Sequence, residues 1–244
     1  DSFNLPTVQN GVKASTTIAE QYREERRKNG LIYSGIYNST AGVNDLNQFI
    51  IAEKITKDVN PSYGSIQKIY TRNTDLLTLC EDKVLKIVAN KDALYNADGN
   101  PELIATNRVL GQAVALPGEF GISTEPGSFV SYADNCYFTD ASRGSVMKIA
   151  GDSLAPISQV GMIDYFADTL KDSNLFTCIG TYDEKKADYN LTIEKRVSWA
   201  SSILFGKQVF TTLTWGERAK GWTSFKTFHP EEGLSINNNY YTWK

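Results

Sequence analysis

The single histidine is the residue on which most hydrolytic chemistry in this chain would depend. A Ser-His-Asp or Cys-His arrangement uses an imidazole as its general base, and the 244 residues include only His229. His229 lies in the segment FKTFHPEEG, where Pro230 follows it in a polar stretch after an expected strand. This context is typical of an exposed loop histidine. We therefore expect no catalytic role for His229.

The three cysteines do not form a pattern that binds metal or builds a disulfide framework. Cys80, Cys136 and Cys178 are widely spaced, and each lies inside an apolar run: LLTLC, NCYF and FTCI. Zinc sites usually need close pairs such as C-x-x-C, and a disulfide framework usually needs an even number. The sequence also lacks the glycine-rich phosphate-binding patterns of nucleotide sites. We expect buried free thiols, no metal and no cofactor.

Carboxylates and tryptophans leave two alternatives open. A glycan hydrolase needs only two suitably spaced acids, but no particular pair stands out among 28 acidic residues. A host-glycan-binding module would stack sugars on exposed aromatic rings. The tryptophans lie in strand-like runs, which favours core packing instead; they are Trp199, Trp215, Trp222 and Trp243. We predict no catalytic, cofactor-binding or metal-binding residues, and no enzymatic activity.

The charge and the apolar residues exclude other classes. The net charge is −3 and 41% of the residues are hydrophobic, which is a globular composition. The one basic run, from Arg23 to Lys28, contains two glutamates, so it is not a phosphate-binding patch. No run of 18 apolar residues is present, so the sequence predicts no membrane-spanning helix.

The elements that must position these residues are mostly strands. Residues 1–30 predict an extended arm and a helix that begins near Ser15 and ends at Gly30. Residues 31–244 predict one β-rich, propeller-like domain. Within it, a short helix is expected at 161–172, where apolar residues recur with helical spacing. The chain ends inside an expected strand, and we interpret it as a fragment of a longer chain or as a chain whose missing strands come from elsewhere.

A hairpin pattern occurs three times. DLLTLCEDKVLKIVAN, NCYFTDASRGSVMKIAGD and FTCIGTYDEKKADYNLTI each run strand, acidic turn, strand, with Asp82, Asp140 and Asp183 near the start of the turn. Such an Asp can accept bonds from nearby backbone N–H groups and hold the turn closed. The aspartates are 58 and 43 residues apart. The shorter interval matches the period of about 40–50 residues that is typical of propeller blades, and the longer one contains the turn-rich connector NADGNPEL. The pattern predicts a mainly β fold with a partial or complete propeller-like array of antiparallel hairpins; a sandwich or stacked hairpins are the alternatives.

Several stretches resemble the muzzle, nozzle or stabilisation proteins of crAss-like and related short-tailed bacteriophages. The similarity follows the chain in order from about Gly30 to its end and is specific in motifs such as YFTDASRGSVMKIAGD and GMIDYFADTL. The stretches are Gly30–Ile87, Tyr137–Ser158, Gly161–Leu170, Gly180–Ile193 and Trp215–Lys244. Members of that family continue well beyond the YYTWK stretch.

The resemblance implies a virion structural protein. Such proteins form rings at the distal end of the tail, around the DNA channel, and help to retain and release the genome. The expected partners are further copies in a six-fold ring and other tail proteins, either portal-proximal or ring proteins, with DNA only as passing cargo. The expected location is the virion, after synthesis in the host cytoplasm. The family supplies no catalytic residues to carry over.

Overall fold

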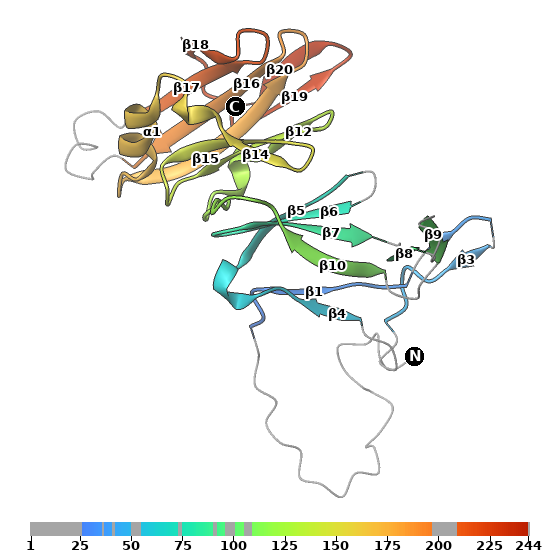
Figure 1. Ribbon diagram of the computed structural model, residues 1–244. Coiled ribbons are helices and arrows are strands. Elements are labelled where there is room, and N and C mark those ends of the chain that lie inside the picture. The colour runs from blue at the N-terminus through green and yellow to red at the C-terminus, as the bar shows by residue number, and fades with distance from the viewer. Residues whose placement is uncertain are drawn as a thin grey trace, which may run out of the picture. The chain divides into compact units, whose positions relative to one another are not determined.

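The computed structural model describes residues 26–35, 37–40, 42–49, 55–72, 75–89, 92–95, 101–104, 109–196 and 209–243 (Figure 1). The mainly β fold is confirmed, and so is the short helix, α1 (Ile163–Leu170). Most of the N-terminal arm and helix lies outside the described residues. Where that helix was expected to end, residues 28 and 29 form a turn and Gly30 begins the first strand.

The chain divides into two compact units. The first takes residues 1–59 and 90–110, and the second takes residues 60–89 and 111–244. The predicted boundary after residue 30 stays a prediction. The described part of the first unit contains three short antiparallel pairs: β1 (Gly30–Ile32) with β4 (Thr56–Asp58), β2 (Tyr37–Asn38) with β3 (Val43–Asn44), and β8 (Asp92–Tyr95) with β9 (Pro101–Ile104).

The second unit is built from four-stranded antiparallel sheets, each with its strands in chain order. The first sheet has β5 (Ile66–Thr71), β6 (Asp75–Cys80), β7 (Val84–Ala89) and β10 (Leu110–Ala115). The second sheet has β11 (Val130–Tyr132), β12 (Asn135–Asp140), β13 (Ser145–Ala150) and β14 (Ser153–Pro156). The third sheet has β15 (Leu175–Asp183), β16 (Asp188–Lys195), β17 (Val209–Gly216) and β18 (Gly221–Lys226).

Shorter elements complete the second unit. A C-terminal hairpin pairs β19 (Glu232–Ile236) with β20 (Asn239–Trp243). Among the described residues of this unit, three 3₁₀ turns lie in the connections: η2 (Pro61–Tyr63), η3 (Pro126–Ser128) and η4 (Ile157–Gln159). The helix α1 lies between the second and third sheets in the sequence and contributes Phe166 and Leu170 to the core.

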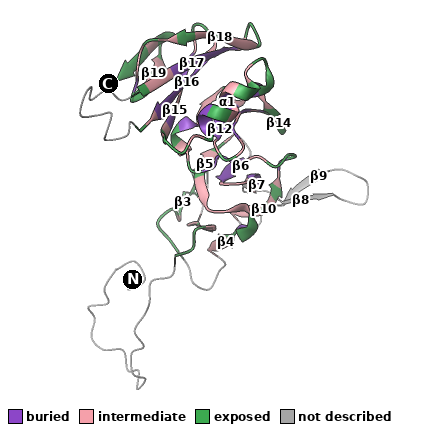
Figure 2. Cartoon of the chain, turned by 90° about the vertical axis from the view of Figure 1, so that its left-hand side faces the viewer, coloured by how far each residue is buried: buried purple, intermediate pink, exposed green. Residues whose placement is uncertain are grey.

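The second sheet is buried on both faces because its central strands alternate apolar residues between two cores. Cys136 and Phe138 of β12 pack with residues of the first sheet, together with their cross-strand partners Ile149 and Met147. Tyr137, which points to the other face of a pleated strand, packs with residues of the third sheet. Figure 2 shows β12, β16 and β17 among the buried segments. The sheets of this unit are therefore stacked face to face.

The three predicted acidic hairpins lie in three separate sheets. Those of Asp82 and Asp140 join the second and third strands of their sheets, but that of Asp183 joins the first and second strands. Only the hairpins of Asp82 and Asp140 therefore occupy equivalent positions in their sheets. Asp140 and Asp183 each accept the backbone N–H three residues ahead, at 3.0 and 3.2 Å, whereas Asp82 accepts from Arg143 instead.

Successive four-stranded antiparallel sheets stacked face to face are compatible with propeller blades. A closed propeller or barrel is not formed by the part of the chain that the structure describes. The propeller therefore stays a prediction, and the established fold is a mainly β array of stacked antiparallel sheets.

We expect Phe138→Ala to destabilise the second unit strongly. Phe138 is fully buried between the first and second sheets, and the truncation of a buried Phe costs about 3–5 kcal/mol. Denaturant unfolding followed by tryptophan fluorescence would measure the loss. Ile163→Ala is the control, because Ile163 is exposed on α1 and should change stability by less than about 0.5 kcal/mol. Equal effects of the two changes would contradict the stacked arrangement.

Candidate functional site

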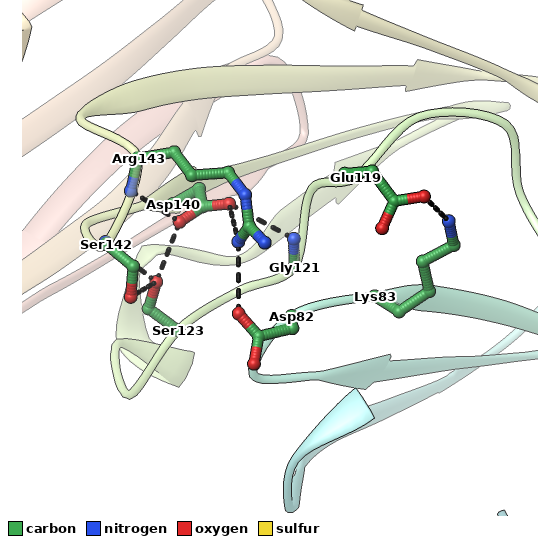
Figure 3. Close-up of polar contacts among 8 residues, drawn as sticks. All are labelled: Asp82, Lys83, Glu119, Gly121, Ser123, Asp140, Ser142 and Arg143. Atoms are coloured by element: carbon green, nitrogen blue, oxygen red, sulfur yellow. Dashed lines mark hydrogen bonds and ion pairs between the residues drawn. The ribbon is translucent and has the colours of Figure 1, made fainter. Parts of the chain in front are cut away.

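The most concentrated group of polar contacts surrounds Asp140, at the end of β12 (Figure 3). The side chain of Asp140 is fully buried. Its Oδ1 accepts bonds from Ser123 Oγ at 2.9 Å and from the Arg143 backbone N–H at 3.0 Å. Its Oδ2 accepts bonds from the Gly121 N–H at 3.2 Å and from Arg143 Nη1 at 3.1 Å. The buried carboxylate is thus fully hydrogen-bonded, as a buried charge must be.

The same cluster connects the first and second sheets. Arg143, in the turn after β12, also contacts Asp82 Oδ1 at 3.2 Å, in the turn between β6 and β7. Burial of the guanidinium lowers the pKa of Arg143, but the carboxylates of Asp140 and Asp82 outweigh it and raise the pKa above its usual value. Arg143 therefore stays charged and bridges the two turns. Beside it, Lys83 contacts Glu119 at 2.7 Å and holds the pKa of that exposed carboxyl below its usual range.

Gly121 allows the connection between the first and second sheets to pass close to the backbone of Glu81. A Cβ on Gly121 would lie 2.2 Å from the backbone oxygen of Glu81. The close approach lets the Ile122 N–H bond to the Cys80 carbonyl, and the Ser123 N–H bond to the Glu81 carbonyl. Any side chain at 121 would push the connection away from the turn that carries Asp82.

A second polar contact between sheets occurs twice, at the other end of the strands. Lys86 of β7 contacts Asp152 at 2.8 Å, in the turn between β13 and β14. Lys148 of β13 contacts Glu217 at 2.7 Å, in the turn between β17 and β18. Each lysine is on the third strand of one sheet, in the Leu-Lys-Ile or Met-Lys-Ile motif. Each acid lies in the turn between the third and fourth strands of the next sheet.

The Glu217 contact is the more enclosed of the two. Its carboxylate also accepts bonds from the Tyr137 hydroxyl at 2.6 Å and from Trp215 Nε1 at 2.9 Å. Burial raises the pKa of Glu217, but the bonds from Lys148, Tyr137 and Trp215 outweigh it, and the pKa is below its usual value. Burial and the neighbouring carboxylate together raise the pKa of Tyr137. At neutral pH the pair is therefore an ionised glutamate and a neutral phenol.

The remaining face of the third sheet is buried but polar, unlike the apolar interfaces between the sheets. Its threonines and asparagine bond to one another: Thr192 to Thr212 at 2.9 Å, and Thr214 to Asn190 at 2.8 Å. Tyr240 of β20 reaches Thr181 at 2.7 Å. The C-terminal segment thus packs on hydrogen-bonding side chains.

His229 is not the exposed loop residue that the sequence predicted. Its ring is half-buried, stacks on Phe210 with centroids 4.3 Å apart, and bonds through Nε2 to the carboxylate of Glu194. Pro230, next to it, is buried. The sequence interpretation failed because Glu194 is 35 residues away along the chain. His229 pairs with one buried carboxylate on a threonine-rich face. Among the described contacts of its ring, none is with a serine or cysteine that could act as a nucleophile.

The tryptophans divide between core and surface. Trp215 is buried, and Trp222 packs against the same core, with its Nε1 donating to the Ile157 carbonyl at 3.1 Å. Trp243 is half exposed, and Trp199 lies outside the described residues. Phe225, on the same strand as Trp222, is exposed, and β18 is an outer strand of its sheet.

The cysteine prediction is confirmed. All three thiols are free and buried, and burial raises the pKa of Cys80 and of Cys136 to about 11. Within the described ranges, no three His, Cys, Asp or Glu residues are grouped so that they could hold a metal ion. In the same part of the chain, no helix is long and apolar enough to span a membrane.

Comparison with known proteins gives no family. No protein-family model matches the sequence, and no curated protein matches it. The polar clusters of Asp140 and Glu217 join stacked sheets and were not predicted from the sequence. The repeated Lys-Ile motif was a signal for the lysine–acid pairs at Asp152 and Glu217, but the acid that each lysine contacts lies more than 60 residues away.

We expect Asp140→Asn to lower the free energy of unfolding by about 3 kcal/mol, because an amide would turn one donor toward the donors of Gly121 or Arg143. Chemical denaturation would measure this. Asp134→Asn makes the same chemical change at an exposed turn position and should have little effect. A loss of similar size in both variants would show that the Asp140 cluster does not hold the two sheets together.

The Glu217 contact predicts a specific dependence of stability on pH. A carboxyl whose pKa is lowered by folding stabilises the protein above its usual pKa of 4.5 and loses that contribution as pH falls through the folded-state value. Below about pH 5, the unfolding free energy of the parent protein should therefore fall more steeply than that of Glu217→Gln. Glu231→Gln, at an exposed position, should follow the parent. Parallel curves for the parent and Glu217→Gln would contradict the ion pair.

Proposed function

We propose that this chain is a structural component of a bacteriophage tail, and that it forms part of a ring around the DNA channel that helps to retain and release the genome. The observation that carries the proposal is the stack of four-stranded antiparallel sheets in the second unit. The segments that form this stack include most of those that carry the resemblance to muzzle and nozzle proteins.

The contacts between the sheets suit the rigid wall of a channel. Apolar cores fill both faces of the second sheet, and ion pairs link the turns at both ends of its strands. Such a stack resists sliding because a shift of one sheet would separate several buried partners at once. A mildly acidic chain also suits a channel that DNA must pass, because affinity for phosphate requires clustered cations.

The expected partners are further copies in a six-fold ring and adjoining tail proteins. Mass photometry of the purified chain and labelling of virions with antibodies raised against it would test this. We expect ring-sized assemblies and label at the distal end of the tail. A chain that stays monomeric at all concentrations, with no label on virions, would contradict the proposal.

A second candidate is a host-glycan-binding tail module. Tyr241 and Trp243 favour it, because both are half exposed and lie on the same face of β20. Aromatic rings of this kind can stack on sugars. Binding to a panel of host-surface glycans that is lost in Trp243→Ala, with unchanged unfolding, would favour this role over the ring.

A further inference from the structure

A column of stacked tyrosine rings joins the second and third sheets. Tyr132 and Tyr137 come from β11 and β12 of the second sheet, and Tyr182 and Tyr189 come from β15 and β16 of the third. Tyr132 stacks on Tyr182, and Tyr182 stacks on Tyr137. Tyr137 in turn stacks on Tyr189. Every ring contact in this tyrosine column therefore joins one sheet to the other.

The two ends of the tyrosine column differ in how firmly their rings are held. Tyr137 and Tyr189 are fully buried, and their hydroxyl groups donate to Glu217 at 2.6 Å and to the Ser128 carbonyl at 3.1 Å. Close packing and these bonds fix both rings. Tyr132 is only half-buried and lies on β11, which is a three-residue outer strand. The column thus has a closed inner end and an outer end that solvent can reach.

The closest pair of rings lies at the outer end. The ring centroids of Tyr132 and Tyr182 are 4.4 Å apart and the ring planes differ by 17°, whereas the centroids of the inner pairs are 5.7 and 4.8 Å apart. Aromatic pairs in proteins usually have centroids about 4.5–7 Å apart, so the outer pair is at the short limit. Burial, followed by the charge of Glu217, raises the pKa of Tyr182 to about 12, so that its phenol keeps its proton at neutral pH.

We propose that Tyr132 and Tyr182 are a modification site, at which a one-electron oxidant joins the second and third sheets through a dityrosine bond. The oxidant first removes an electron from Tyr132, and the hydroxyl proton passes to water. The Tyr132 radical takes an electron and a proton from Tyr182, and a second equivalent of oxidant then acts on Tyr132 again.

The two phenoxyl radicals couple through the ring carbons next to their oxygens. A carbon–carbon bond forms, and the hydrogen on each coupled carbon moves to the oxygen of the same ring, which restores both phenols. In total, two electrons pass to two equivalents of oxidant and two protons pass to water. Coupling requires one ring to turn. Tyr132 on its short outer strand can do so, whereas the inner rings are held by packing and hydrogen bonds.

The dityrosine bond would act on the stack as a disulfide does. It would close a long loop across both sheets and restrict the unfolded chain. The proposal depends only on the stacking of the second and third sheets and does not require the proposed ring, so each proposal can fail without the other.

Photo-oxidation of the dilute purified chain tests the site, with a ruthenium tris-bipyridine complex and persulfate as the source of a one-electron oxidant. We expect dityrosine fluorescence in the monomer band of a denaturing gel, and mass spectrometry of the digest should find Tyr132 linked to Tyr182. Tyr132→Phe keeps the ring but removes the phenol, so it should lose this product. Tyr165→Phe is the matched control, because Tyr165 is also half-buried but its described ring contacts are with Phe166 and Phe225. It should give the yield of the parent.

Two further samples make the result decisive. Tyr182→Phe should show the same loss as Tyr132→Phe. The parent chain oxidised in concentrated urea has no stacked rings, so the link between residues 132 and 182 should fall to the level of links between other tyrosines. An unchanged yield of this link in either variant's monomer band, links in the native monomer that join only other tyrosines, or an equally prominent link in the unfolded chain would each overturn the proposal.

Discussion

The burial of the second sheet on both faces is the constraint on which the rest of the second unit depends. A strand that alternates Cys136, Tyr137 and Phe138 cannot leave either face in water without exposing an aromatic ring. One face therefore requires the first sheet and the other requires the third. The stack follows from residues in a single hairpin, and the flanking sheets need only present one apolar face each.

The polar contacts fix how the stacked sheets are aligned, which the apolar packing alone does not. Apolar faces alone tolerate sliding, because the hydrophobic effect has no direction. Arg143 between Asp82 and Asp140 fixes one end of the stack, and the lysine–acid pairs fix the other. The polar back of the third sheet, which includes the His229–Glu194 pair, holds the C-terminal segment by hydrogen bonds instead of by an apolar core. That interface therefore depends on direct polar contacts between buried side chains.

Local patterns predicted elements better than they predicted partners. The short helix, the buried cysteines and the acidic hairpins follow from spacing within about a dozen residues, and the structure contains them. The surroundings of His229 and Phe225 do not follow from local spacing. His229 contacts Glu194, which is distant in the sequence, and Phe225 is on a strand whose outer position depends on the pairing of the whole sheet. The same applies to Asp140: its place in a turn was evident, but Gly121 and Ser123 reach it from another connection. Closure into a propeller is a still longer-range property, and hairpin spacing alone does not determine it.

The insertion of β8 and β9 between β7 and β10 has a consequence for the order of assembly. The first sheet is discontinuous in the chain, because its fourth strand returns only at Leu110. The second sheet occupies residues 130–156 without interruption, so its contacts close short loops at low entropic cost. We expect the second sheet to form early and to serve as the template on which the first sheet is completed. Strands β5, β6 and β7 would then be synthesised before the sheet that they pack against. Until that sheet forms, their apolar face would be exposed and chaperones could bind it.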